Sequence, residues 1–336
     1  MRHHLLVSLV AAVAIWSVSP AARQSAPPDS YLGQTPPGDV PELFMPGVVS
    51  TGAAERDMAI MPDGREFYFC VSTPGYASAT IMVSRRNGDR WTEPEVAPHM
   101  DDARYMNLEP AIAPDGQRFY FMSNRPAPDD PKGTRKQDVW VMDRRGDGWG
   151  EPRNLGAPVN TEAGEYFPSV TRSGTLYFTR ENRNDPNNGI YRSRLVNGVY
   201  TEPERLPAQV NLGDARFNAF IDPDERYIIV PAQGGPTSVG GVDYFIVFRN
   251  GDGTWSDPIN LGGPVNTAGS VEYSASVSPD GRYFFFMSSR GLPEDRRPAR
   301  FTATWFRAIH DSPQNGNPDI YWMKADFLMR LKPPAR

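Results

Sequence analysis

A short block recurs five times along the chain: a few apolar residues, a turn built on Pro-Asp-Gly, and a run of aromatic and aliphatic residues. The five turns lie at Pro62, Pro114, Arg172, Pro223 and Pro279, and the third and fourth are degenerate copies. They recur at roughly 50 to 60 residues, the period of a propeller blade or a comparable array. Pro presets the backbone of such a turn and Gly relieves its strain, while aromatic runs suit a pleated sheet. The repeat therefore predicts an array of similar β units.

The second copy shows four strands in one unit, at 109–113, 118–123, 138–142 and 149–155. The other copies keep this order. Their third strands begin at Thr80, Gly189, Asp243 and Asp319, and their fourth strands at Trp91, Tyr200 and Trp255. Pro152 fits the fourth strand only if that strand lies at a sheet edge, because Pro donates no hydrogen bond. Four antiparallel strands, repeated, are typical of propeller blades.

The fifth copy stops after its third strand, and its missing strand is predicted at the other end of the chain. Residues 41–51 resemble residues 152–161, and both segments precede a first strand by a similar distance. We therefore expect an all-β fold, a five-bladed β-propeller of four-stranded antiparallel blades, closed by an N-terminal strand that completes the C-terminal blade. Closure removes open sheet edges, so a monomer is expected. A stacked β-solenoid is the alternative.

Two copies extend into a longer pattern that begins with Pro-Asp-Gly and ends with Ser and Arg, at Pro114–Arg125 and Pro279–Arg290. Together with third strands that begin Asp-Val-Trp or Asp-Ile-Tyr, at Asp138 and Asp319, this pattern resembles the TolB-like, WD40-like propeller repeats of exported bacterial proteins. The resemblance covers nearly all of the mature chain. It implies the propeller fold, but such repeats occur in partner-binding proteins, peptidase accessory domains and polysaccharide-degrading enzymes, so it names no function.

The N-terminus predicts export. Basic residues precede an apolar run from Leu5 to Val18, and small residues follow at Ser19 and Ala21, so residues 1–21 read as a signal peptide. Residues 22–40 read as a flexible linker and 41–332 as one propeller domain with a long insertion at 291–318. We expect a periplasmic or secreted protein without a stable membrane span after cleavage; an uncleaved anchor is the alternative. A net charge of −5 argues against a nucleic-acid partner.

Polar residues occupy two equivalent positions at the beginning of every first strand. The earlier position holds Glu55, Asn107, Glu165, Arg216 and Glu272, and the later one holds Asp57, Glu109 and Asn218. Tyr166, Phe217 and Tyr273 lie between them. In a propeller these residues are expected to ring the mouth of the central channel. The pattern breaks at the later position, where Phe167 and Ser274 replace the acid, and such departures are where a site would be built.

The insertion at 291–318 adds aromatic residues and a histidine to the same face. Trp305 is a candidate ligand contact, and His310 beside Asp311 is a candidate base. Long loops with embedded aromatic residues are more often lids or binding surfaces than disorder. Arg125 with Asp138 and Arg290 with Asp319 recur together and are expected to pair within their own blades.

Carboxylates around an axial cavity permit three chemistries. The first is acid/base catalysis on a glycosidic bond, with Glu55, Asp57, Glu109, Glu165, Glu272 and His310 as candidate catalytic residues. The second is calcium binding, although no cofactor is otherwise predicted. The third is binding without reaction, with Asn107, Tyr166, Arg216, Phe217, Asn218, Tyr273 and Trp305 as candidate ligand contacts. We predict an exported recognition module for a protein or glycan ligand; the alternative is a carbohydrate-active hydrolase or lyase.

Overall fold

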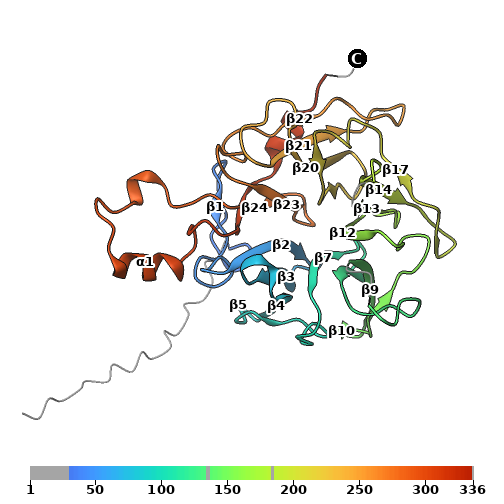
Figure 1. Cartoon of the computed structure of the whole chain (residues 1–336), viewed down its shortest axis with the longest axis horizontal. Helices are drawn as coiled ribbons and strands as arrows, with labels where there is room; N and C mark the ends of the chain where they lie inside the picture. Colours follow the sequence, from blue (N-terminus) through green and yellow to red (C-terminus); the bar gives the residue numbers. More distant parts are fainter. Residues whose placement is uncertain (1–29, 134–136, 183–184, 335–336) are drawn as a thin grey trace, which may run out of the picture.

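The structure, a computed structural model, describes residues 30–133, 137–182 and 185–334. Five small antiparallel sheets stand around a common axis (Figure 1), which confirms the predicted five-bladed propeller. The first strand of each blade lies nearest the axis. The beginnings of these strands and the loops between second and third strands share one face, here named the loop face. The Pro-Asp-Gly turns lie on the opposite face, here named the turn face.

The blades contain these strands. Blade one has β2 (Ala54–Ile60), β3 (Glu66–Ser72), β4 (Ala79–Asn87), β5 (Arg90–Trp91) and β6 (Glu95–Val96). Blade two has β7 (Asn107–Ile112), β8 (Arg118–Ser123), β9 (Asp138–Arg145), β10 (Gly148–Trp149) and β11 (Arg153–Asn154). Blade three has β12 (Gly164–Val170), β13 (Leu176–Glu181), β14 (Gly189–Ser193) and β17 (Glu204–Arg205), beside the hairpin of β15 (Leu195–Val196) and β16 (Val199–Tyr200).

The remaining blades follow the same order. Blade four has β18 (Ala215–Arg216), β19 (Phe220–Ile221), β20 (Tyr227–Gln233), β21 (Asp243–Phe248) and β22 (Ile259–Asn260). Blade five has β23 (Glu272–Val277), β24 (Tyr283–Ser288), β25 (Asp319–Lys324) and β1 (Glu42–Leu43). The fourth strands of the first three blades are broken into two pieces at Pro94, Pro152 and Pro203. Each proline lies at the outer edge of its blade, as the sequence required, since it cannot donate to a ladder.

The ring is closed as predicted. β1 pairs antiparallel with β25, so that Glu42 lies opposite Trp322. Phe44 follows β1, is fully buried, and packs edge-on against Phe67, Phe285 and Trp322 with ring centroids 5.3–5.6 Å apart. These rings come from the first blade and the last, so Phe44 joins the two ends of the sheet array.

The core lies between neighbouring blades, because each sheet packs its face against the next. The aromatic runs that follow the turns supply much of it: Phe119 of β8 is fully buried against Tyr68 of the preceding blade. The degenerate fourth turn keeps the shape of the others. Glu225 there has φ +54°, close to the +71° of Gly116 in the clear second copy. The turn geometry is therefore retained even where glycine is lost.

The segments outside the blades differ in part from expectation. The predicted signal peptide, residues 1–21, lies outside the described residues. The predicted linker packs against the propeller from Tyr31 onward: the Tyr31 ring lies tilted against the Tyr283 ring with centroids 4.6 Å apart, and Leu32 is buried. The aromatic and apolar side chains in this segment explain the difference, since they find an apolar surface on blade five. In the described part of the chain, none of the helices has the length and apolar character needed to span a membrane.

The short helices lie in the connections. η1 (Pro74–Tyr76) connects β3 to β4, and α2 (Asp326–Arg330) packs on blade five after β25. The insertion contains η2 (Glu294–Arg296) and α1 (Ala303–His310), and no residue of α1 is buried. Figure 1 shows α1 standing away from the ring, while Asn315 and Asn317 tie the end of the insertion to the Gly52 carbonyl.

Candidate functional site

A β-bulge occurs at the same place in the first strand of four blades, and in blade four the strand is interrupted there. In all five blades the residue at this place has a left-handed backbone, with φ between +50° and +63°, and is buried. These residues, here named the axial ring, are Asp57, Glu109, Phe167, Asn218 and Ser274. The side chains of a regular blade face the neighbouring blades; the bulge instead turns this one residue toward the axis.

Hydrogen bonds from the axial ring connect adjacent blades. The Phe167 amide donates to Glu109 Oε2 at 2.7 Å, and the Glu109 amide donates to Cys70 Sγ at 3.2 Å. The Asn218 amide donates to Thr179 Oγ1 at 3.0 Å. Cys70 is fully buried, and burial raises the pKa of its thiol well above the usual range. This cysteine therefore acts as a structural acceptor between blades rather than as a nucleophile.

Arg56 lies at the centre of the ring and was missed by sequence analysis. Its Nε is 3.2 Å from Asp57 Oδ2 and one terminal nitrogen is 3.4 Å from Glu109 Oε1. The guanidinium also lies 5.3–5.4 Å from the ring centroids of Tyr76 and Tyr273, whose hydroxyls are 2.9 Å apart. The available signal was a charge at a position where the other blades have Leu or an aromatic residue. For Tyr76, which lies in a loop, the sequence held no signal.

The charges of this cluster are shielded from solvent. Burial opposes the charge of Arg56, but Asp57 and Glu109 together raise the pKa of its guanidinium well above the ordinary value. Burial also raises the pKa of Glu109, with Arg56 acting in the opposite direction. One guanidinium is thus the shared ion-pair partner of two carboxylates inside the channel.

The residues at the earlier of the two polar positions do not face the axis. Glu55, Glu165 and Glu272 are turned into their blades, where each accepts hydrogen bonds from a threonine of the preceding loop: Thr51, Thr161 and Thr267. Glu165 also pairs with Arg180 at 2.8 Å, and Asn107 bonds Ser123 and Arg125. The structure therefore brings Asp57, Glu109 and Asn218 together at the axis, but not the three glutamates.

The expected arginine–aspartate pairs take other partners. Arg125 donates to the Asn107 side chain and to the His99 carbonyl, and Arg290 donates to the carbonyls of Pro264 and Val265. Both guanidiniums lie over aromatic rings of their own blade, at 4.7–5.4 Å from the centroids. Asp319 accepts from the Gln314 amide instead. The arginines thus fix the loop before their blade, a role that the repeat alone did not reveal.

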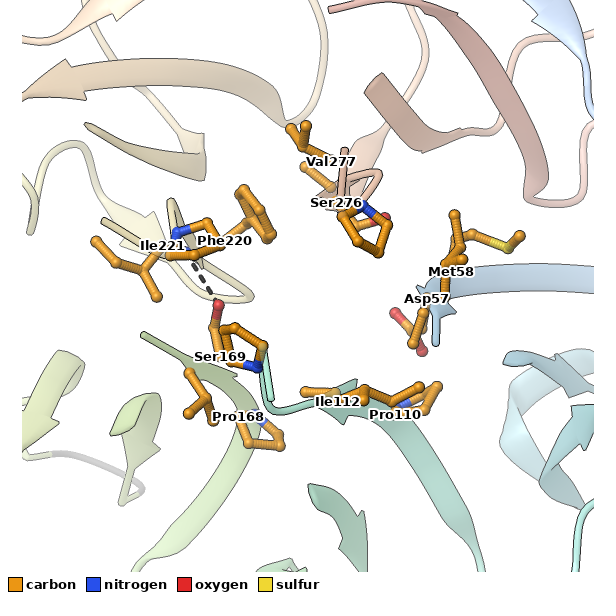
Figure 2. Close-up of a pocket in the computed structure, with 18 of the residues that line it drawn as sticks. Asp57, Met58, Pro110, Ile112, Pro168, Ser169, Phe220, Ile221, Ser276 and Val277 are labelled. Carbon is orange, nitrogen blue, oxygen red and sulfur yellow. Dashed lines mark hydrogen bonds between the residues drawn. The ribbon is translucent and has the colours of Figure 1, made fainter. Parts of the chain in front are cut away.

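The axial ring divides the channel into two chambers. The upper chamber, on the loop face, has a volume of about 410 Å³ and is lined by Arg56, Tyr76, Glu109, Tyr166, Phe217, Asn218 and Tyr273, among others. The lower chamber, on the turn face, has a volume of about 360 Å³ and receives Asp57 and Phe167 (Figure 2). Glu109 and Asp57 therefore line different chambers.

Two further hollows adjoin the upper chamber on the loop face. One of about 570 Å³ shares Tyr76 and Met106 with it and extends to Arg104 and Tyr105. The other, of about 400 Å³, shares Tyr166 and Phe217 and extends to Arg216 and Asp214. The three neighbouring hollows share these lining residues and are together named the loop-face groove here. It contains the predicted contacts Tyr166, Arg216, Phe217, Asn218 and Tyr273.

The insertion does not contribute to this groove. Trp305 packs with Phe301 and Phe306 in an aromatic cluster with centroids 5.0–5.2 Å apart, and none of the hollows that form the groove includes it. His310 ends α1 and is exposed. Among residues 30–133, 137–182 and 185–334, no three His, Cys, Asp or Glu residues gather as a metal site.

Two buried carboxyls at the junction of the last and first blades predict a pH dependence of stability. Burial raises the pKa of Asp319 to about 7, and burial likewise raises the pKa of Glu55 to about 7. Between about pH 4 and 7 the folded chain then holds protons that the unfolded chain has lost, so the free energy of unfolding falls as the pH rises. Each group contributes a slope of at most about 1.4 kcal/mol per pH unit.

Urea unfolding at pH 5, 6, 7 and 8 measures this slope, and Asp319→Asn with Glu55→Gln is expected to flatten it. A stability that rises from pH 5 to pH 8 in the parent chain would contradict the assignment.

No protein-family model and no curated protein matches this chain. Solved structures do. TolB from Acinetobacter baumannii is 13% identical with a TM-score of 0.45, and the match covers 81% of this chain and 57% of TolB. A thermostable family-43 glycoside hydrolase is 15% identical with a TM-score of 0.47, covering 84% of this chain and 92% of that one. A prolyl endopeptidase is 12% identical with a TM-score of 0.40, covering 81% and 38%. Similarities this low carry no statement about the activity of this chain.

Proposed function

We propose that this protein is an exported recognition module that binds an extended ligand, a glycan or a protein segment, in the loop-face groove. The observation that carries the proposal is that three neighbouring hollows on one face share Tyr76, Met106, Tyr166 and Phe217 as lining residues. Export rests on the apolar N-terminal segment alone.

The middle of the groove is preorganised for contact. Tyr76 and Tyr273 are joined by their hydroxyls and backed by the buried Arg56 guanidinium, so their rings lose little freedom when a ligand binds. Tyr76 remains 41% exposed. Aromatic rings combine an apolar face with a polar edge, which suits the C–H faces and hydroxyls of a sugar ring. Polar side chains beside them, such as Glu181 and Arg216, offer hydrogen bonds. Of the two ligand classes, a glycan fits this lining better.

The arrangement of carboxylates favours binding over glycoside cleavage. Both carboxyl groups of a glycosidase must flank one glycosidic bond. Here Glu109 lines the upper chamber and Asp57 the lower one, while Glu55, Glu165 and Glu272 are turned into their blades by threonine hydroxyls. Of the candidate acids only Glu109 lines the loop-face groove, and the other carboxylate in its chamber, Glu181, accepts a hydrogen bond from the Tyr166 hydroxyl.

Tyr76→Ala is the variant that tests the proposal. Isothermal titration against tetra- to octasaccharides and against extended peptides is expected to find a glycan ligand whose affinity falls about tenfold in the variant, a loss typical of one aromatic contact. Phe306→Ala is the matched control: it removes an exposed ring, 54% exposed, from the insertion instead of the groove.

Weakened binding in Phe306→Ala with unchanged binding in Tyr76→Ala would move the site to the insertion. Binding of peptides alone would make the ligand a protein. Release of reducing ends from the oligosaccharides, abolished by Glu109→Gln or Glu272→Gln, would replace binding by catalysis.

A further inference from the structure

The lower chamber is built from equivalent positions of the five blades. A collar of β-branched side chains surrounds it, formed by Ile60, Ile112, Val170, Ile221 and Val277. Prolines line it at two depths: Pro110 and Pro168 near the axial ring, and Pro62, Pro114, Pro223 and Pro279 at the turn face. A volume of about 360 Å³ lies within the range of small-molecule pockets. The walls therefore suit an apolar body of a few carbon atoms.

One charged group faces this apolar space. Figure 2 shows the Asp57 carboxylate directed toward the chamber, while the side chain of Asp57 is only 1% exposed. Arg56 lies beside it as an ion-pair partner and the buried Cys70 thiol donates to it, but neither oxygen of Asp57 has a nitrogen or hydroxyl hydrogen-bond donor among the described residues. A thiol is a weak donor, so this buried carboxylate is costly unless a stronger donor reaches it. The open side of the carboxylate is the chamber.

The net charge of Arg56, Asp57 and Glu109 indicates that the missing hydrogen-bond donor is a cation. Arg56 contacts both Asp57 and Glu109, so with both carboxylates ionised the cluster carries one excess negative charge. A cation that enters from the turn face would neutralise this excess and donate to Asp57. Among the described residues, the other charged groups on the chamber wall are Arg172 and Asp280, which lie at its outer end, in the turns. A bare metal ion would find one carboxylate and aliphatic walls, which is a poor ligand set.

We propose that the lower chamber binds a small organic cation, an ammonium group on a short aliphatic body, with the ammonium donating to Asp57 and the body within the five-residue collar. This site lies on the face opposite the loop-face groove and does not depend on the function proposed for that groove. The ligand class of the lower chamber follows from one negative charge at its axial-ring end and from its apolar walls.

Calorimetric titration of the full chain at pH 8 with pentylammonium, 1-pentanol, pentanoate and methylammonium tests the proposal. Pentylammonium is expected to bind at least tenfold more tightly than pentanol, because only the cation pairs with Asp57. Methylammonium lacks the apolar body and is expected to bind more weakly. Equal affinity for pentylammonium and pentanol, or no binding of pentylammonium at millimolar concentration, would overturn the proposal without any variant.

Three variants locate the bound cation within the chamber. Asp57→Asn keeps the shape of the side chain, and asparagine tolerates the left-handed backbone. This variant is expected to lower the affinity for pentylammonium at least tenfold and to leave the affinity for 1-pentanol unchanged. Asp280→Asn makes the same change at the outer end of the chamber and is expected to change affinity less than twofold. An equal loss in both would contradict the assignment to Asp57. If Asp57→Asn fails to fold, Ser276→Phe fills the chamber and is expected to abolish binding of both apolar probes; unchanged binding there places the ligand elsewhere.

Discussion

Replacing Arg56 by leucine is expected to lower the free energy of unfolding by about 3–5 kcal/mol, because it leaves two buried carboxylates without a counter-ion. Arg56 is 6% exposed and contacts Asp57 and Glu109 at 3.2 and 3.4 Å. Leucine fills part of the same volume, so the loss measures charge rather than a cavity. Urea unfolding at pH 8, followed by tryptophan fluorescence, gives the difference.

The pH dependence of this variant separates charge from packing. Removing Arg56 takes away the influence that lowers the pKa of Glu109, so the pKa of the folded state rises further above the ordinary value of 4.5. Protonation of Glu109 then removes its uncompensated charge. The loss in the free energy of unfolding caused by Arg56→Leu is therefore expected to shrink as the pH falls from 8 toward 5.

Two further variants serve as controls. Arg104→Leu removes an exposed arginine whose contact with Asp102 is 2.6 Å, and little change is expected there. Arg56→Leu combined with Asp57→Asn and Glu109→Gln is expected to recover part of the loss. An Arg56→Leu chain as stable as the parent would show that the guanidinium does not hold the axial ring together.

Replacing Phe44 by alanine is expected to cost about 3–5 kcal/mol, the usual range for a buried Phe in a core. Phe44 is fully buried between rings from blades one and five, although β1 itself contributes only two residues to the sheet. Phe44 is therefore a central contact of the closing segment, beside Tyr31 and Leu32, and its loss weakens the contact between the two ends of the ring. The midpoint of urea unfolding measures the effect.

Val40→Ala is the matched control for closure. Val40 lies just before β1 and is 67% exposed, so its truncation is expected to change stability by less than about 0.5 kcal/mol. A Phe44→Ala chain with an unchanged midpoint would mean that the N-terminal strand lies outside the cooperative unit.

The blade count and the closing strand were predictable because both follow from local patterns that repeat. Pro-Asp-Gly turns before aromatic runs mark the second strand of each blade, and the likeness of residues 41–51 to 152–161 identified the closing strand. Such patterns depend on turn chemistry and the two-residue period of a strand, which a single sequence displays directly. The packing of Tyr31 on blade five was missed because its partners lie some 250 residues away.

Five blades, their strands and the sets of equivalent polar positions could thus be predicted from local patterns. Which of these positions face the axis depends on contacts between blades and on the bulges in the first strands. Positions two residues apart, such as Glu55 and Asp57, point the same way in a regular strand, but a bulge with a left-handed residue turns Asp57 into the channel and leaves Glu55 bonded to Thr51 inside its blade. The division of the channel into two chambers has the same origin: Arg56 finds Glu109 only when neighbouring blades come together, a contact across 53 residues that no local pattern records.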